Sequence, residues 1–136
     1  MTDPDLVARK LAAIETHLRE LRELANLDRM DEDVKEERFI TATLRLVLQN
    51  VIDVAAHIVA DDRLGAPKTL RQTFQILGRA GRLDRELAES LGRMAGLRNL
   101  LVHEYAALDL DRVRTIVKDH LGDIDGFVET VRARLR

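Results

Sequence analysis

One eight-residue segment combines side chains that can do chemistry: Arg98-Asn99-Leu100-Leu101-Val102-His103-Glu104-Tyr105. An imidazole such as that of His103 can take up and release a proton near neutral pH. A guanidinium such as that of Arg98 stays charged and offers a planar fork of donors to phosphate or carboxylate groups. Tyr105 is the only tyrosine of the chain and adds a phenolic hydroxyl. These residue types make the segment the first candidate for a functional site.

The position of Arg98 is unusual for a charged residue. The predicted helix around it carries an apolar stripe at spacings of four and three: Leu87, Leu91, Met94, Leu101 and Tyr105. Arg98 occupies the stripe position between Met94 and Leu101, where a guanidinium is costly unless it is paired or reaches water. Two interpretations stay open. Arg98 either extends to the surface or pairs with a carboxylate such as Asp53, or it faces a wet cleft.

His103 is out of phase with its neighbours. A regular helix turns about 100° per residue, which places Tyr105 nearly under Arg98, and His103 about 140° from Arg98 and about 160° from Tyr105. The three side chains cannot converge from one unbroken helix of an isolated chain. We therefore expect the helix to end near residues 102–104, with Asp109 capping the next helix, and we expect a dimer as well.

The remaining elements are also predicted to be helices. Asp3 and Pro4 suit the start of a first helix that extends to about residue 25. A long second helix is expected to start near Asp31–Asp33 and to reach about Ala60, a short one is expected over 69–79, and a fourth from Asp84. Val113, Val117, His120, Ile124, Phe127, Val131 and Leu135 keep one register, which predicts a single long final helix rather than two. The predicted fold is all-α: an up-and-down bundle of about five helices in a single domain, residues 1–136.

The amino-acid composition supports this fold and excludes several kinds of functional site. Only 3% of residues are aromatic and none is cysteine, which favours helices and excludes disulfides and thiolate sites. No leader segment and no uninterrupted apolar run of about 18 residues is visible, so we expect a soluble, cytoplasmic protein without a membrane partner. The net charge is −2. Residues 63–98, however, hold eight basic and three acidic side chains, and this block ends at Arg98.

The segment resembles the signature of HepT toxins, which belong to the HEPN superfamily. Their motif is an arginine, four residues, a histidine, one residue and a tyrosine, often with asparagine after the arginine, which matches Arg98, Asn99, His103 and Tyr105. The resemblance covers most of the chain. It includes a long second helix with Asp53 and His57, the loop Gly65-Ala66-Pro67, and Met94-Ala95-Gly96-Leu97 before the motif.

This resemblance implies an HEPN-like dimer with paired motifs at a shared cleft, acting as a metal-independent endoribonuclease. The 2′-hydroxyl of the RNA would attack the adjacent phosphorus, His103 would transfer protons, and Arg98 would stabilise charge on the phosphorane. Asn99 would orient the phosphate or the His103 ring. Asp53 and His57 lie one turn apart and would form a structural pair or support Arg98. No metal or other cofactor is expected in this chain, because no histidine pair has the spacing of a zinc helix.

The resemblance also implies a partner and a modification. In the family, an antitoxin of the MntA type, a small nucleotidyltransferase that uses ATP and Mg²⁺, transfers AMP to the motif tyrosine, here Tyr105. The chain would then be the toxin of a type VII-like toxin–antitoxin module, neutralised when AMP occupies the place of the RNA phosphate. The alternative is a non-catalytic helical binding module. In that case the same segment docks the partner nucleotidyltransferase, and the free dimer cuts no RNA.

Overall fold

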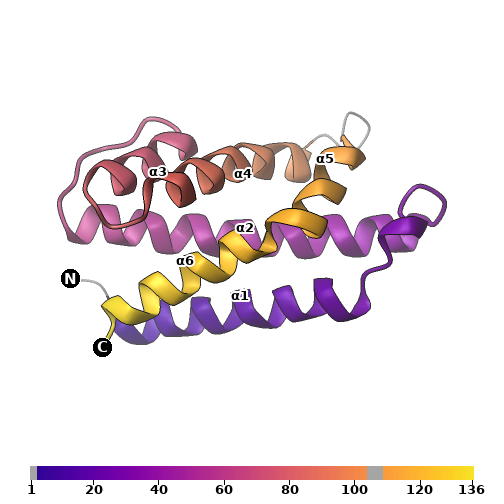
Figure 1. The fold of residues 1–136 in the computed structure, drawn as a ribbon, viewed down its shortest axis with the longest axis horizontal. Coiled ribbons are helices and arrows are strands. Elements are labelled where there is room, and N and C mark those ends of the chain that lie inside the picture. The colour runs from indigo at the N-terminus through magenta and orange to yellow at the C-terminus, as the bar shows by residue number, and fades with distance from the viewer. Residues whose placement is uncertain (1–2, 104–108) are drawn as a thin grey trace.

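The structure, a computed structural model, describes residues 3–103 and 109–136, and these residues form helices and no strand. Figure 1 shows their order along the chain. The elements are α1 (Pro4–Leu24), η1 (Leu27–Arg29), α2 (Val34–Asp61), α3 (Leu70–Arg79), α4 (Arg85–His103), α5 (Leu110–Thr115), the π-helical turn η3 (Ile116–His120) and α6 (Leu121–Arg134). The all-α prediction of about five helices is confirmed, with α5, η3 and α6 forming one continuous helical run.

Side-chain caps start most of the helices where the sequence predicts them. Asp3, Asp33 and Asp109 each accept hydrogen bonds from two backbone N–H groups of the first turn that follows. Thr69 accepts one from the N–H of Gln72, 3.1 Å from its hydroxyl oxygen. These bonds satisfy donors that a helix start leaves without an intrahelical partner. The helix boundaries therefore follow largely from local chemistry.

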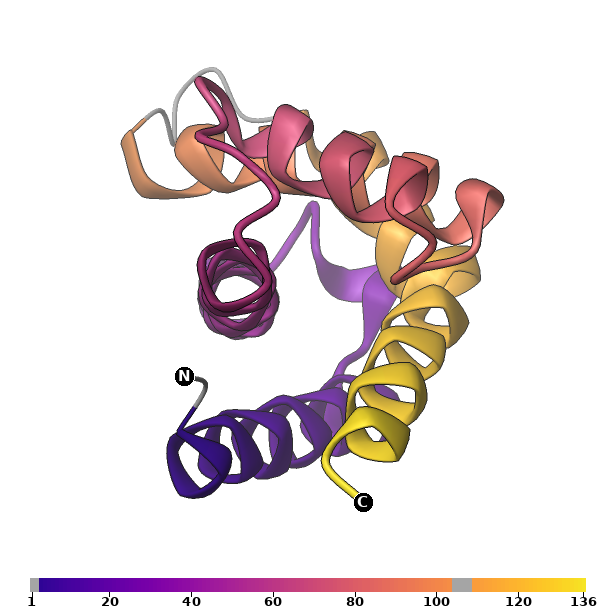
Figure 2. The same ribbon diagram turned by 90° about the vertical axis from the view of Figure 1, so that its left-hand side faces the viewer.

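The long helix α2 lies in the middle of the bundle. Viewed nearly along its axis, α2 has α1 on one side, the α3–α4 pair on the other, and α6 across from it (Figure 2). Its apolar side chains join one buried aliphatic cluster, in which Phe74 and Phe127 meet edge to face with ring centroids 6.4 Å apart. The opposite strip of α2 is not buried in the bundle.

Helices α3 and α4 pack very closely as a hairpin. A Cβ atom placed on Gly78 would lie 2.9 Å from the Cβ of Ala88, closer than side-chain carbons approach in real structures. Gly81, with φ +72°, provides the left-handed turn after α3. The short α3 is thus fixed against the helix that carries the Arg98 segment.

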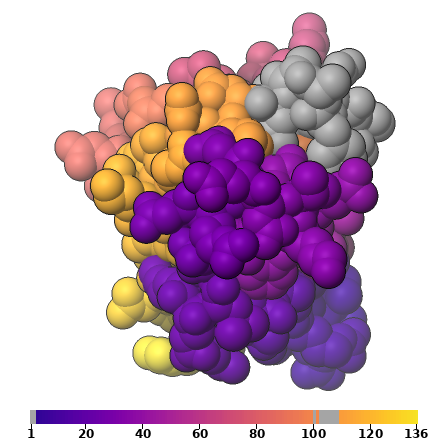
Figure 3. Space-filling view, turned by 90° about the vertical axis from the view of Figure 1, so that its right-hand side faces the viewer, coloured from indigo at the N-terminus to yellow at the C-terminus, as the bar shows by residue number. Residues whose placement is uncertain are grey.

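The final helical run contains a feature that the apolar spacing does not predict. Residues 110–134 are helical without interruption, as expected, but η3 inserts a π-helical turn and His120 has φ −120° and ψ 3°. The run bends there, so that α5 and α6 point in different directions (Figure 1). Nη2 of Arg114 lies 2.6 Å from Oδ2 of Asp31, and this ion pair fixes α5 to the α1–α2 connection. Figure 3 shows this end of the bundle.

By length and composition alone, α2 could cross a membrane, with a mean hydropathy of 1.4 in its most apolar window. Gln49, Asn50 and Asp53 interrupt the apolar residues, so the sequence shows no uninterrupted span. Core helices of soluble proteins pass the same test, and 56% of this window lies inside the bundle. One such helix is weak evidence for a membrane segment.

Asp62 connects three segments at the opposite end of the bundle from the α1–α2 connection. Its carboxylate accepts hydrogen bonds from Nε of Arg82 at 2.7 Å and from both terminal nitrogens of Arg134 at 2.8 and 2.6 Å. Hydrogen bonds from Arg134, which has the larger effect, and from Arg82 hold the pKa of Asp62 far below its usual range. The carboxylate side chain is only 15% exposed, so solvent screens this cluster less than an open surface pair.

Replacing Asp62 with asparagine should lower the free energy of unfolding by about 1 kcal/mol near neutral pH, because partly exposed ion pairs contribute modestly. A lowered folded-state pKa stabilises the fold above the unfolded pKa of about 4 and loses this effect as the pH falls further. Urea unfolding of both proteins between neutral pH and pH 2 checks this. Glu89→Gln, which breaks an exposed pair with Arg93, is the control and should change stability by less than about 0.5 kcal/mol. An Asp62→Asn effect that is the same at every pH would contradict the explanation.

Candidate functional site

Arg98 reaches out of the core towards α2. Its Nε donates a hydrogen bond to Oε1 of Gln49 on α2 at 2.7 Å, and its Nη1 donates to Oδ1 of the neighbouring Asn99 at 2.8 Å. The side chain is half-buried. Its second terminal nitrogen, Nη2, forms no hydrogen bond with the described residues. The guanidinium is therefore oriented by two neutral amides, and no carboxylate of the described residues pairs with it.

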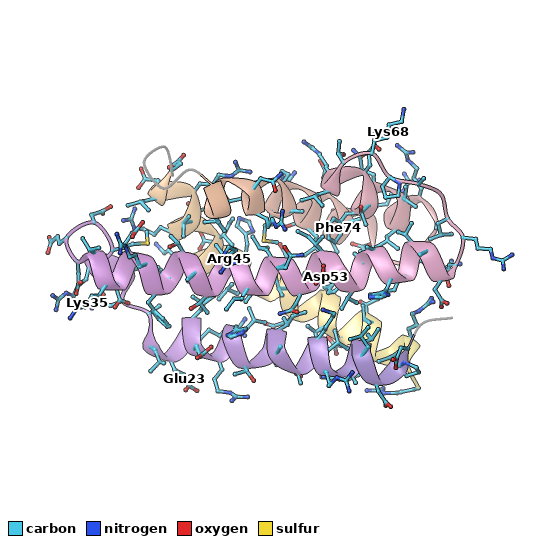
Figure 4. The ribbon with its side chains drawn as sticks, turned by 180° about the vertical axis from the view of Figure 1, so that it is seen from behind. Glu23, Lys35, Arg45, Asp53, Lys68 and Phe74 are labelled. Carbon is cyan, nitrogen blue, oxygen red and sulfur yellow. The ribbon has the colours of Figure 1, made fainter. Side chains whose placement is uncertain are left out.

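Of the interpretations that the sequence left open, direct pairing of Arg98 with Asp53 does not occur in the structure. Gln49 lies between them: its Nε2 donates to Oδ1 of Asp53 at 2.8 Å while its Oε1 accepts from Arg98. Asp53 in turn forms an ion pair with Nζ of Lys10 on α1 at 3.2 Å. Figure 4 shows Asp53 on α2. We call Lys10, Asp53, Gln49, Arg98 and Asn99 the α1–α2–α4 network.

The geometry of the network fixes the orientation of the Gln49 amide. One end of an amide only accepts hydrogen bonds and the other only donates them. Arg98 requires the oxygen of Gln49 and the carboxylate of Asp53 requires its nitrogen, so a flipped amide would lose both bonds. Lys10 provides the charge that balances Asp53, so within the described residues the positive charge of Arg98 has no acidic partner.

Sequence reasoning missed Gln49 and Lys10. A signal for Gln49 existed, because it precedes Asp53 by one helical turn on the same face of α2. No comparable signal existed for Lys10, which lies 43 positions before Asp53 and meets it only through the packing of α1 on α2.

His57 does not join the network. The side chain is exposed, and within the described part of the chain no hydrogen bond or ion pair connects it to Asp53, so the expected pair is not formed. Both residues line a shallow hollow of about 510 Å³ between α1 and α2, which Lys10 also borders. His57 is thus near the network and faces solvent.

Two residues of the motif lie at or beyond the edge of the described chain. The bounds of α4 reach His103, which is also the last residue described before position 109, so the helix end expected at residues 102–104 stays a prediction. Asp109 caps α5 as predicted. The side chain of His103 and the whole of Tyr105 lie outside the described residues. Of the predicted site residues, the structure therefore brings together Arg98, Asn99 and, through Gln49, Asp53.

The strip of α2 that faces away from the core borders the network. It is polar or small at most positions and includes Leu46, a leucine that is 38% exposed. Its exposed and half-buried residues are Arg38, Ala42, Arg45, Leu46, Gln49, Asn50, Asp53, Ala56, His57 and Ala60. A ligand or a second protein at Arg98 would meet this strip. Among the described residues, no group of three or more histidine, aspartate or glutamate side chains is arranged to hold a metal ion.

Comparison with protein families and curated proteins gives consistent matches. A family model described as "Ribonuclease HepT-like" matches residues 14–131. The chain is 28% identical to the "mRNA nuclease HepT" of Shewanella oneidensis over 130 residues, covering 95% of this chain and 98% of that one. It is 29% identical to the "tRNA nuclease HepT" of Aphanizomenon flos-aquae over 136 residues, with coverages of 98% and 92%.

Solved structures agree with these matches. A toxin–antitoxin crystal structure with AMP-PNP has a chain of TM-score 0.88 and 28% identity, covering 95% of this chain and 98% of that one. A tri-AMPylated Shewanella oneidensis HEPN toxin in complex with MNT antitoxin gives TM-score 0.86 and 28% identity, with coverages of 98% and 99%. The family model spans most of the residues, and the chain belongs to the ribonuclease HepT-like family.

Proposed function

We propose that this chain is the toxin of a toxin–antitoxin pair and cleaves RNA without a metal ion. The observation that carries the proposal is the state of Arg98: a guanidinium held by Gln49 and Asn99, with Nη2 and one proton of Nη1 left for an anion. A carboxylate partner would have neutralised the charge, whereas amides only orient it. Such a fork matches two oxygens of a phosphate group.

The proposed reaction is an attack by a ribose hydroxyl of the RNA on the neighbouring phosphate group. The 2′-hydroxyl oxygen of a ribose attacks the neighbouring phosphorus while His103 accepts its proton, and the bond from phosphorus to the 5′-oxygen breaks. That oxygen takes up a proton from a second acid, for which the His103 of a second copy is available in a dimer. The products are a 2′,3′-cyclic phosphate and a free 5′-hydroxyl. Arg98 stabilises the extra negative charge on the five-coordinate phosphorus.

The proposal includes a homodimer in the cytoplasm. The exposed strip of α2, with Leu46 at its centre and Arg98 beside it, supplies the surface against which a second copy would place its own motif. It also includes inhibition by AMP transfer to Tyr105. The relatives of known structure support this, one being tri-AMPylated and bound to its antitoxin. A nucleotidyltransferase partner would supply ATP and Mg²⁺, and this chain would need no cofactor.

Purified protein should cleave single-stranded RNA in the presence of excess EDTA and leave 2′,3′-cyclic phosphate ends, because no step requires a metal. His103→Ala and Arg98→Ala should each lower the rate at least about 100-fold, since each removes a proton-transfer or charge-stabilising group. Gel analysis of end-labelled RNA measures both. Dependence on Mg²⁺, or full activity in both variants, would refute the mechanism. Absence of cleavage by a dimer that still binds its nucleotidyltransferase would favour the non-catalytic binding module.

Gln49 should act as a positioning residue. Gln49→Met keeps the size of the side chain but removes both amide hydrogen bonds. The value of kcat should fall about tenfold with little change in KM or melting temperature, because Arg98 loses the bond that orients it. In an Arg98→Lys background, the same substitution should cost much less, since lysine lacks the fork that Gln49 holds. Equal losses in both backgrounds, or a matching drop in melting temperature, would indicate a purely structural role.

Co-expression with an adjacent nucleotidyltransferase should increase the mass of the intact protein by whole AMP units. Tyr105→Phe should abolish the first of these increments, because it lacks the acceptor oxygen. Intact-protein mass spectrometry provides the measurement, and a catalytically dead partner enzyme provides the control. An unchanged mass series in Tyr105→Phe would exclude Tyr105 as the acceptor.

A further inference from the structure

A second feature beside the network is a groove along the α3–α4 hairpin. Two hollows of about 330 and 580 Å³ lie between the exposed faces of these helices, and Arg71 borders both. The larger one extends from Lys68 to Gly96 and Asn99, and the smaller one continues past Gly92 to Arg79 and Arg85. We call this surface the α3–α4 groove. One end of it is Asn99, the residue that holds the guanidinium of Arg98.

The floor of the groove is open because α4 presents glycines there. A Cβ atom at Gly96 would meet nothing within 4 Å. At Gly92, a Cβ atom would lie 3.3 Å from Cγ of Arg71, so the missing side chain lets the stem of Arg71 lie against α4. On the facing helix, Arg71, Gln75 and Arg79 follow one another at a spacing of four, which places them in a row.

The charges in the groove are not balanced within the chain. Lys68, Arg71, Arg79 and Arg85 are exposed, and in the described part of the chain none of their side chains forms an ion pair or a hydrogen bond. Glu89 is the one carboxylate among the lining residues, and it pairs with Arg93 at 3.3 Å. Several arginines outside the groove do bind carboxylates.

Arg82, Arg114, Arg132 and Arg134 each bind at least one carboxylate. The groove differs from these positions because it gathers several cations in one hollow, and no described carboxylate binds Arg71, Arg79 or Arg85 there. A row of unpaired cations in a hollow is suited to an anion that carries repeated charges.

We propose that the α3–α4 groove binds the phosphodiester backbone of single-stranded RNA and leads it to Arg98. This rests on the proposed ribonuclease function, which it deepens by assigning the path of the substrate. Arg71 and Arg79 are eight residues apart on α3, about 12 Å along its axis, so the row spans more than one nucleotide. No aromatic side chain lines the groove in the described residues, so it offers no stacking platform, and binding depends on phosphates rather than on base identity.

The first test uses a short fluorescent 2′-O-methyl oligouridylate, which the proposed reaction cannot cleave, and the full-length protein. Arg71→Gln with Arg79→Gln should weaken binding about tenfold at low salt. The slope of log K against log salt between about 50 and 200 mM should become shallower by about 1.4, or 0.7 for each lost phosphate contact. Arg9→Gln with Arg19→Gln removes the same charge from exposed positions of α1, on the other side of the bundle, and should leave the slope unchanged.

A second pair of variants tests the groove without removing any arginine. Gly96→Glu places a carboxylate on the open floor, and Gly96→Gln places an uncharged side chain of the same shape there. Both should fold, since a side chain fits at Gly96 and a helix interior favours it over glycine. Gly96→Glu should bind the oligonucleotide at least about fivefold more weakly than Gly96→Gln. Equal binding by the two variants would overturn the proposal.

The results of these experiments distinguish RNA binding in the α3–α4 groove from the proposed ribonuclease activity. Slower cleavage of long RNA by the groove variants, with unchanged cleavage of a dinucleotide, supports the groove as a substrate path. Wild-type salt slopes in Arg71→Gln with Arg79→Gln overturn it even if the protein is a ribonuclease. If these variants bind RNA normally but no longer associate with a nucleotidyltransferase partner, the groove is a protein-docking surface and the proposal is overturned. Groove-dependent binding without any RNA cleavage would refute the ribonuclease function and leave the groove in place.

Discussion

The arrangement of the site depends on one constraint: a permanent positive charge must be held at the edge of an aliphatic core without being neutralised. Burying a guanidinium is costly, and pairing it with a carboxylate would remove the field that an anionic ligand needs. Gln49 meets both requirements, because its oxygen binds Arg98 and its nitrogen binds Asp53. Lys10 then balances Asp53. The acidic charge of the network is thus satisfied on the side of α1, and the basic charge stays available at α4.

The same separation of charges extends over the whole molecule. The net charge of −2 would not suggest a protein that binds a polyanion. Two sets of arginines, which are not all of the arginines of the chain, differ in their partners. Those near the ends of helices, such as Arg82, Arg114 and Arg134, bind carboxylates and connect segments that are distant in sequence. Those of the α3–α4 groove lie in a hollow beside the site with no carboxylate bound. Local potential, rather than net charge, decides which ligands such a surface attracts.

Much of the fold was predictable, because its signals are local. Capping residues act on the N–H groups next to them, so Asp3, Asp33, Thr69 and Asp109 mark helix starts in any tertiary context. Apolar spacing predicted the buried faces for the same reason. The π-helical turn at residues 116–120 escaped prediction because the buried residues Val117 and Leu121 keep a spacing of four, which a regular α-helix also allows. No hydrogen bond or ion pair joins His57 to Asp53 in the described residues; Asp53 binds a lysine on α1 and an amide one turn earlier, and the His57 side chain is exposed.

Sequence alone determined that Arg98 stands where the apolar stripe requires a hydrophobic side chain, and that the motif cannot converge from one unbroken helix of an isolated chain, so that a helix end or a second subunit is needed. Both conclusions follow from helical periodicity, which is a property of the chain itself. Only the tertiary structure decided what holds Arg98, because Gln49 lies 49 positions away and Lys10 lies on a third helix. It also decided that the basic block of residues 63–98 forms a groove, because that requires the close packing of α3 on α4 permitted by Gly78 and Gly92. Side chains distant in sequence meet only when helices pack, and no local pattern records that meeting.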